Sequence, residues 1–292
     1  MARMDGKTCV VTGATGGIGR ETALGLARAG AAVAVVGRDR ARGEAALAEV
    51  RAAATGGAPS LFLADLGSLG DVRRLAADLD AALPRIDVLV NNAGAMNAVR
   101  KTTVDGYETT LAVNHLAPFL LTNLLLPKLR ASAPVRVVTV ASDAHRMVPA
   151  MDWDDLMSER RYAGMRVYGQ SKLANILFAK ALAQRLAGTG VTSNALHPGV
   201  VATGFGKNDP GWMRWVVRLG APFMLSPARG AATTLYLATA PEVEGVTGEY
   251  FARSRVARPT AAAEDTAAAE RLWEISARLV GLAPAEASAS RP

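Results

Sequence analysis

The chain has little that would tie it together by covalent or metal bonds: among 292 residues there is one cysteine, Cys9, and there are three histidines. One cysteine cannot form an internal disulfide, and Cys9 lies in an apolar run where we expect it to pack as a small core residue. This usage favours a reducing, cytoplasmic environment. The histidines, His115, His145 and His197, are far apart in the sequence and lack metal-ligand spacing, so we expect structural roles and no metal site.

The chain also lacks the patterns typical of nucleic-acid or membrane proteins. Its formal net charge of +7 comes from scattered arginines in alanine-rich segments, with no lysine-arginine run and no basic stripe interleaved with aromatic residues. A compositional preference for Arg and Ala explains this excess, although a basic surface would also attract an anionic cofactor. The first apolar strand begins after only a few residues, and we find no uncharged apolar run of 18 residues. We therefore expect no nucleic-acid partner and no membrane anchor.

What the chain does contain is a regular alternation of short Val/Leu-rich runs and longer segments of helical period. The runs cover residues 8–13, 31–37, 60–65, 87–94, 135–142, 191–199 and 248–251. Near-continuous apolar strands are typical of a parallel sheet that is covered on both faces, and alternating helices supply the crossovers. The pattern predicts a single-domain α/β fold, a Rossmann-type doubly wound parallel sheet with helices on both faces.

The limits of this domain follow from composition. Gly30 and Gly188 stand just beyond helical segments, as C-terminal caps do. We find no repeat and no linker, so one domain is expected over residues 1–282. The segment 283–292 has the composition of a disordered tail.

A glycine-rich turn, "TGATGGIGR" at residues 12–20, follows the first strand. Gly13, Gly17 and Gly19 permit a tight turn, close approach of the backbone to a pyrophosphate, and close packing of the next helix. Thr15 and Ile18 lie in the same turn and are included among the predicted cofactor contacts. An ordinary strand-helix connection is the alternative, but the position after the first strand favours dinucleotide binding.

The end of the second strand, "VVGRDR", bears on the choice of dinucleotide. A carboxylate there would bind the ribose 2′-hydroxyl of NAD(H), whereas a guanidinium suits the 2′-phosphate of NADP(H). Gly37 stands where the acid is expected and Arg38 follows it, which favours NADP(H). Two alternatives remain: Arg38 is one solvated arginine among many, or Asp39 reaches the ribose of NAD(H).

Several further motifs occur in an order that resembles one family. They are "ADL" around Asp65, "NNAG" at 91–94, "VNHLAPFLLT" with Asn114, "VTVASDAHR" with Ser142, "YGQSK" at 168–172 and "HPGVVAT". With the glycine turn, they resemble the short-chain dehydrogenase/reductase family up to about Ala257. The branch that looks most similar contains the retinol dehydrogenases and the WW-domain-containing oxidoreductase. The chain departs from that branch at Ala117-Pro118, where Gly-His is often found, and in lacking an N-terminal membrane anchor, which puts a retinoid substrate in doubt.

The resemblance implies an alcohol/carbonyl oxidoreductase with catalytic residues Asn114, Ser142, Tyr168 and Lys172. Lys172 would also bind the nicotinamide ribose, and Asn114 would hold a water that passes protons from Lys172 to bulk solvent. Asp65 and Leu66 would lie near the adenine, Asn91 near its ribose and Thr203 near the carboxamide. The remaining predicted cofactor contacts are Ala93, Gly94, Tyr168, Lys172, Pro198, Gly199 and Val201.

The spacing of Tyr168 and Lys172 gives this assignment a physical basis, because positions i and i+4 share one face of a helix. Ionising a tyrosine at neutral pH costs about 4 kcal/mol, and an ammonium about 4 Å away returns about the same amount at an effective dielectric near 20. Desolvation opposes the phenolate, so the positive oxidised nicotinamide must assist. Tyr168 would then be the general base or acid, and Ser142 would donate a hydrogen bond to the reacting oxygen. Taken alone, this pair favours surface packing on a helix; together with Ser142, Asn114 and the glycine turn, it favours catalysis.

The segment 204–227 holds the information on the substrate. Trp212, Trp215, Val216 and Leu219 have helical spacing between Gly/Pro breaks, which is typical of a lid with an apolar inner face. This favours a bulky, lipophilic alcohol, ketone or aldehyde. The alternative is a core helix or a helix in a homo-oligomer interface. For the whole chain, the alternative to an enzyme is a catalytically silent dinucleotide-binding sensor or scaffold.

Overall fold

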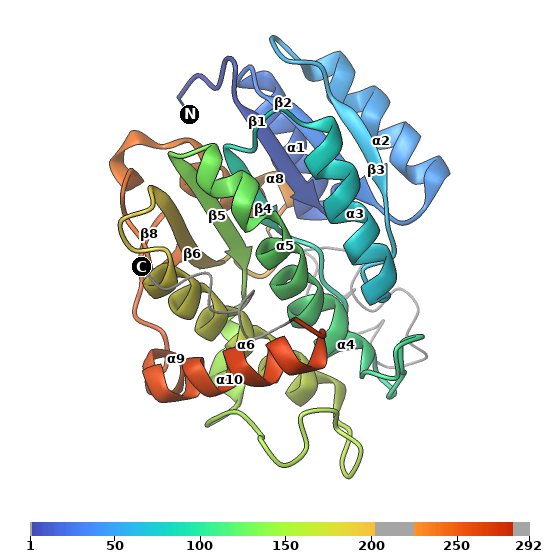
Figure 1. Ribbon diagram of the computed structural model, residues 1–292, viewed down its shortest axis with the longest axis vertical. Coiled ribbons are helices and arrows are strands. Elements are labelled where there is room, and N and C mark those ends of the chain that lie inside the picture. The colour runs from blue at the N-terminus through green and yellow to red at the C-terminus, as the bar shows by residue number, and fades with distance from the viewer. Residues whose placement is uncertain (1, 202–224, 283–292) are drawn as a thin grey trace.

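An eight-stranded sheet forms the centre of the computed structural model, which describes residues 2–201 and 225–282. Figure 1 shows the sheet with its covering helices. The strand order is β3-β2-β1-β4-β5-β6-β7-β8; every neighbouring pair is parallel except β7 and β8, which are antiparallel. The strands are β1 (Thr8–Thr12), β2 (Ala32–Gly37), β3 (Ser60–Leu63), β4 (Val88–Asn91), β5 (Val135–Val140), β6 (Val191–His197), β7 (Tyr250–Ala252) and β8 (Arg255–Val256). The predicted fold class is confirmed.

Helices cover both faces of the sheet. One face carries α1 (Gly17–Arg28), α2 (Arg40–Ala53) and α8 (Pro227–Thr239). The other carries α3 (Leu69–Ala82), α5 (Ala117–Ala131) and α6 (Gly164–Arg185), and α10 (Thr266–Leu279) packs against α6 (Figure 1). The shorter elements are α4 (Thr109–Leu111), the π-helical turn η1 (Ala112–Leu116), the 3₁₀ turns η2 (Asp143–Met147) and η4 (Pro241–Val243), and α9 (Ala261–Glu264).

Strand β1 shows why this sequence forms a doubly covered sheet. All five of its residues are buried, and successive side chains point to opposite faces. Val10 belongs to the core beneath α3, α5 and α6, whereas Cys9 and Val11 belong to the core beneath α1 and α8. A strand that buries both faces must be apolar throughout, and Cys9 is a buried core residue as expected.

The segment Thr109–Ala131, which joins α4, η1 and α5, corrects one sequence expectation. It is the one helix in the described part of the chain that is long and apolar enough to cross a membrane, with a mean hydropathy of 1.3. However, 83% of the most apolar window is buried inside the fold. Its hydrophobicity is therefore that of a helix in the core of the fold.

The ends of several elements also bear on the predictions. Gly30 has a φ of +103° and directly follows Ala29, the C-cap residue of α1, which confirms the predicted cap. Gly188 has a φ of +76° but lies three residues beyond α6, whose C-cap residue is Leu186. Strand β8 was not predicted; it pairs with β7 across Arg253 and Ser254, both left-handed. Most of the proposed lid, Thr203 and the tail 283–292 lie outside the described residues. The last lid position, Pro227, already begins α8, and Ser226 caps that helix.

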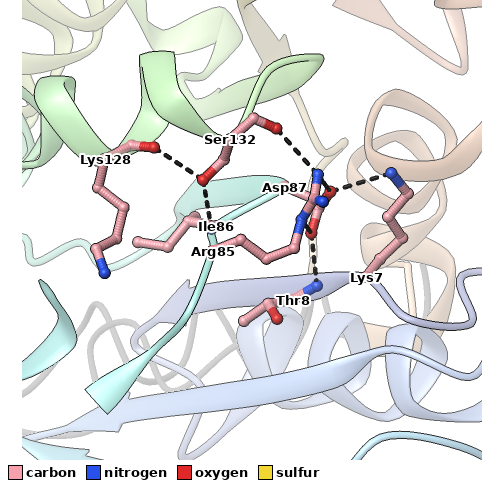
Figure 2. Close-up of polar contacts among 7 residues, drawn as sticks. All are labelled: Lys7, Thr8, Arg85, Ile86, Asp87, Lys128 and Ser132. Carbon is pink, nitrogen blue, oxygen red and sulfur yellow. Dashed lines mark hydrogen bonds and ion pairs between the residues drawn. The ribbon is translucent and has the colours of Figure 1, made fainter. Parts of the chain in front are cut away.

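A polar cluster occupies the amino-terminal edge of the sheet, where β1 and β4 begin (Figure 2). The carboxylate of Asp87, which is 3% exposed, accepts from Lys7 Nζ at 3.0 Å, from the Thr8 backbone N–H at 2.9 Å, and from both Nε and Nη2 of Arg85 at 2.9 and 2.6 Å. Arg85 and the Ile86 backbone N–H both donate to Ser132 at the end of α5. The buried charge is thus paired, and it ties together three elements.

Candidate active site

The opposite, carboxyl-terminal edge contains the point where the chain reverses its winding direction, between β1 and β4. In doubly wound sheets, ligands bind at such a switch point. Thr12 and Asn92 join the two strand ends here: Asn92 Nδ2 donates to the Thr12 carbonyl oxygen at 2.8 Å, and Thr12 Oγ1 accepts from the backbone N–H groups of Asn92 and Ala93 at 3.0 and 3.1 Å. Neither residue was predicted from the sequence to have a role.

The glycine turn has the geometry that a bound pyrophosphate requires. A Cβ atom on Gly19 would lie 2.3 Å from the Gly13 carbonyl oxygen, and one on Gly13 would lie 2.9 Å from Ala93 Cα. Gly13 also has a φ of +66°. Helix α1 begins immediately afterwards, and its N-cap residue Gly16 makes no side-chain hydrogen bond to the first-turn N–H groups. The positive end of a 12-residue helix is therefore presented with glycine backbone around it, which fits a dinucleotide. Gly17, Thr15 and Ile18 are half-buried in this turn.

The end of β2 explains why a glycine stands there. A Cβ on Gly37 would lie 2.3 Å from Thr15 Cγ2, so the turn leaves no room for an acidic side chain at this position. The Asp39 carboxylate accepts from the Arg42 backbone N–H at 2.8 Å and caps α2. Arg38 is exposed, and Nη2 of Arg42 lies 3.2 Å from the position that a Cβ on Gly16 would take. Three arginines follow β2: Arg38, Arg42 and Arg40, of which Arg40 pairs with Glu44 within α2.

The residues predicted to surround the adenine and its ribose occupy two settings. Asp65 is exposed just after β3, and its Oδ1 accepts from the Gly67 backbone N–H at 2.9 Å. Leu66 beside it is half-buried. Asn91 is 3% exposed, and its Nδ2 donates to Thr122 Oγ1 on α5 at 3.0 Å. Its side-chain amide is thus used to hold β4 against α5.

Helix α6 brings Tyr168 and Lys172 together. Lys172 is 3% exposed, its Nζ donates to the Val140 carbonyl oxygen at 2.9 Å, and it lies 5.4 Å from the centre of the Tyr168 ring. Asn175, one turn further, donates to the same carbonyl at 3.2 Å. The end of β5 therefore fixes the ammonium beside the phenol ring.

Asn114 lies on the π-helical turn η1, where one extra residue widens the helix. Its Oδ1 accepts from the Ala95 backbone N–H at 2.6 Å, and its Nδ2 donates to the Ala95 carbonyl oxygen at 3.0 Å and to Ser171 Oγ at 2.9 Å. A Cβ on Gly94 would lie 3.4 Å from Asn114 Oδ1 and 3.6 Å from Lys172 Nζ, so the absence of a side chain keeps this approach open. Single π-turns are frequent at functional sites.

The protonation of this group of residues follows from burial. Desolvation raises the pKa of Tyr168 to about 12, and the side-chain hydrogen bond with Ser142 opposes this rise. Desolvation lowers the pKa of Lys172 to about 8. The phenol is therefore protonated at neutral pH and the amine is close to its titration point. Desolvation thus has the largest influence on the Tyr168 pKa, in the direction that the sequence argument expected for a buried phenol.

Ser142 follows β5 and caps η2, with its Oγ accepting from the Ala144 backbone N–H at 3.1 Å. Behind it, His197 and Tyr250, which are distant in sequence, both contact Asp143. His197 Nδ1 accepts from the Asp143 backbone N–H at 3.2 Å, and the Asp143 carboxylate accepts from Tyr250 at 3.0 Å. Burial works to raise the pKa of Asp143, but His197, Tyr250 and Arg146 together hold it below its usual value. Sequence spacing gave no signal of this cluster.

The loop after β6 carries the last group of predicted contacts. Pro198 and Gly199 are half-buried, and Gly199 has a φ of +90°. Val201 pairs with Leu225, so the two ends of the segment outside the described residues lie side by side.

Comparison with known proteins identifies the class to which this fold and site belong. Residues 7–213 match the family model described as short chain dehydrogenase. The chain is 45% identical over 298 residues to dehydrogenase/reductase SDR family member 13 of Bos taurus, with 98% of this chain and 76% of the relative covered. It is also 45% identical over 287 residues to human retinol dehydrogenase 13, with 96% and 86% covered.

Solved structures agree. A protein from Mycobacterium paratuberculosis superposes with a TM-score of 0.77 at 34% identity, over 96% of each chain. A short chain dehydrogenase from Burkholderia cenocepacia in complex with NADP has a TM-score of 0.70 at 28% identity, over 85% of this chain and 96% of that chain.

The chain is therefore a member of the short-chain dehydrogenase/reductase family, and it is an oxidoreductase of that family. Within the family it is similar to the branch that includes retinol dehydrogenases, as the sequence motifs indicated. The family supports a nicotinamide dinucleotide cofactor and interconversion of an alcohol and a carbonyl.

Proposed function

We propose that the chain interconverts an alcohol and a carbonyl on a bulky, lipophilic small molecule, prefers NADP(H) to NAD(H), and uses Tyr168 as the general acid/base. The observation that carries this proposal is the group formed by the buried Lys172 and the half-buried Ser142 and Tyr168. Lys172 Nζ lies 5.4 Å from the Tyr168 ring, and Tyr168 shares a side-chain hydrogen bond with Ser142. A protein that only binds a dinucleotide would gain nothing from a buried ammonium beside a desolvated phenol.

The roles of the three side chains follow from their protonation. A Tyr168 phenol with a pKa near 12 carries its proton at neutral pH, as a general acid in carbonyl reduction must. Ser142 donates a second hydrogen bond to the oxygen that gains negative charge. For alcohol oxidation, Tyr168 must lose its proton, and the positive charge of Lys172 stabilises the phenolate. When bound, the nicotinamide cofactor supplies or accepts the hydride.

The preference for NADP(H) is supported by three features at the end of β2. Thr15 excludes an acidic side chain at Gly37, and Asp39 is occupied in capping α2. Arg38 and Arg42 supply positive charge at the same place, where a 2′-phosphate would lie if the dinucleotide follows the switch point. Both guanidinium groups can bind phosphate oxygens in a bidentate geometry.

The substrate class rests on the relatives and on the sequence. Several relatives carry the name retinol dehydrogenase, and retinol is a lipophilic alcohol. The apolar residues of the proposed lid, Trp212 to Leu219, add to this argument from sequence alone. A cytoplasmic location is proposed from the single buried cysteine.

A panel of alcohols, ketones and aldehydes of increasing chain length, assayed with both cofactors, tests the proposal. We expect turnover with NADPH or NADP⁺, with kcat/KM rising along the series, since each buried methylene contributes up to about 0.8 kcal/mol. Cofactor binding without turnover of any member would favour the sensor or scaffold. A kcat/KM that does not change with chain length would contradict the proposal of a lipophilic substrate. Equal affinity for NADH and NADPH would contradict the proposed cofactor preference.

A further inference from the structure

His145 lies directly behind Ser142 and is fully buried, at 0% exposure. Its Nδ1 is 2.7 Å from the Ser142 carbonyl oxygen, and its Nε2 is 3.3 Å from the backbone nitrogen of Thr260. A carbonyl oxygen only accepts hydrogen bonds and a backbone N–H only donates. The ring is therefore the neutral tautomer that carries its proton on Nδ1, and both nitrogens are used.

The surroundings of the ring keep it in this form. Desolvation lowers the pKa of His145, although the bond to Ser142 opposes the shift. The ring meets Tyr250 edge-on, with centroids 5.2 Å apart and planes inclined by 72°. Protonation of Nε2 would set two donors against each other at Thr260. The imidazole is thus built into the wall as an uncharged donor toward Ser142.

The same turn also fixes the side chain of Ser142. The Ser142 carbonyl oxygen receives both the backbone N–H of His145, at 3.1 Å, and its Nδ1. Ser142 Oγ accepts from the Ala144 backbone N–H at 3.1 Å. The backbone of Ser142 is extended, with φ −167° and ψ 154°. Both ends of Ser142 are therefore held by η2, and His145 anchors η2 to the segment around Thr260.

We propose that His145 is a positioning residue for Ser142: its Nδ1–H holds the Ser142 carbonyl so that Oγ stays aligned with Tyr168 and with the reacting oxygen of the substrate. This inference rests on the role given to Ser142 in the proposed function. His145 itself does not reach the reacting atoms. Its effect is expected in the rate of the chemical step and not in cofactor affinity.

Two substitutions distinguish the roles of the two ring nitrogens of His145. His145→Asn places an amide N–H₂ near the position of Nδ1 and keeps a donor for the Ser142 carbonyl. His145→Gln extends its amide toward the position of Nε2, so it keeps a partner for Thr260 but loses the Nδ1 donor. Both replace the buried ring with a smaller amide, so they serve as matched controls for packing, and the folded fraction of each is measured by the stoichiometry of cofactor binding.

If His145 acts through Ser142, kcat of His145→Gln falls about tenfold, while His145→Asn stays within about threefold of the parent. KM and the dissociation constant of NADPH change little in both. In a Ser142→Ala background, whose residual rate is measured with excess enzyme, His145→Gln causes no further loss, because the group that it positions is gone.

Two results would overturn the inference. One is an equal loss of kcat in the Asn and Gln variants; the other is a loss in His145→Gln that is as large in the Ser142→Ala background as in the parent. Nitrogen NMR of the parent, with the His145 signal assigned from its disappearance in His145→Gln, gives a readout that does not need turnover. A proton on Nε2 would refute the positioning contact even if the enzyme were active. Failure of the parent to turn over any alcohol or carbonyl, with the Nδ1–H form observed, would instead refute the proposed function.

Discussion

At the amino-terminal edge of the sheet, the buried carboxylate of Asp87 is met by donors from Lys7, Thr8 and Arg85. At the carboxyl-terminal edge, the equally buried ammonium of Lys172 donates to the carbonyl of Val140. Over the ranges 2–201 and 225–282, no carboxylate lies within ion-pair distance of Lys172. One sheet thus holds two buried charges in different ways.

The difference separates what stabilises the fold from what serves reactivity. Burying a charge that is paired and hydrogen-bonded costs little free energy. A buried group without a counterion instead has its pKa shifted so that its neutral form is favoured. Lys172 shows this shift, with a pKa of about 8. The charges at the amino-terminal edge therefore hold elements together. At the carboxyl-terminal edge, the buried positive charge of Lys172 beside Tyr168 lowers the stability of the folded protein.

The strongest test at the carboxyl-terminal edge is Tyr168→Phe, which keeps the ring and removes the proton. We expect kcat to fall by about 10²–10⁴-fold, the range typical of general acid-base groups, while NADPH binding is retained. Steady-state kinetics and fluorescence titration measure the two quantities. Tyr107→Phe is the matched control, since it removes a hydroxyl that donates to the Leu279 carbonyl. Near-parental activity of Tyr168→Phe would contradict the assignment.

The corresponding test at the amino-terminal edge is Asp87→Asn. It removes the charge that Lys7 and Arg85 share, and we expect the free energy of unfolding to drop by about 3 kcal/mol. Urea denaturation monitored by circular dichroism measures this, and kcat per folded molecule should not change. Asp80→Asn, at a carboxylate with a 64% exposed side chain paired with Lys128, should change stability by less than about 1 kcal/mol. Equal effects of the two variants would remove the structural role of Asp87.

The destabilising effect of burying Lys172 can be measured as a pH dependence of the free energy of unfolding. Its pKa is lowered from 10.5 to about 8 in the folded protein, so between these values the unfolded chain binds the extra proton. The contribution of Lys172 to stability is thus unfavourable below pH 8 and becomes less so as pH rises to 10.5. We expect the stability of Lys172→Met relative to the parent to fall by about 2–3 kcal/mol across this window. A constant difference in urea denaturation from pH 7 to 10 would refute the shift.

The smallest expected effect concerns the arginines after β2. Arg38→Gln should raise the dissociation constant of NADPH by about tenfold to a hundredfold, through loss of a charge-assisted contact, and should leave NADH binding nearly unchanged. Arg42→Gln should act in the same direction. Arg40→Gln is the control, because Arg40 is exposed and pairs with Glu44 within α2. If all three variants weaken both cofactors alike, the effect is general electrostatic attraction and not recognition of the 2′-phosphate.

Local pattern was sufficient to predict the sheet, because strands buried on both faces are apolar at every position, as in β1. It was also sufficient for the α6 pair, since Tyr168 and Lys172 are one helical turn apart. The two-residue strand β8 has no such periodicity and depends on the hairpin at Arg253 and Ser254. The predicted strands extend three residues beyond the end of β4 and two residues beyond the end of β5. The residues that follow these two strands belong to the site and not to the sheet.

The parts of the site that escaped prediction depend on contacts between distant segments. Thr12 and Asn92 meet because β1 and β4 are neighbours, although 80 residues separate them. His145 meets Thr260 across 115 residues. Neither contact can be recognised from a regular spacing of residues in the sequence. Asn114 was singled out from its motif, but the π-turn that carries it depends on the bonds that its side chain makes with Ala95 and Ser171.

That π-turn has a consequence for any attempt to redesign the protein. With 3.6 residues per turn, one extra residue shifts the phase of a helix by about 100°, so α4 and α5 present different faces to the core than one uninterrupted helix would. Deleting a single residue between Ala112 and Leu116 would restore regular bonding and, by itself, favour the helix. The same deletion would rotate Asn114 away from Ala95 and Ser171. The extra residue of the π-turn thus sets the rotation between the two halves of one helix. Removing it would make the helix regular but would disrupt the site.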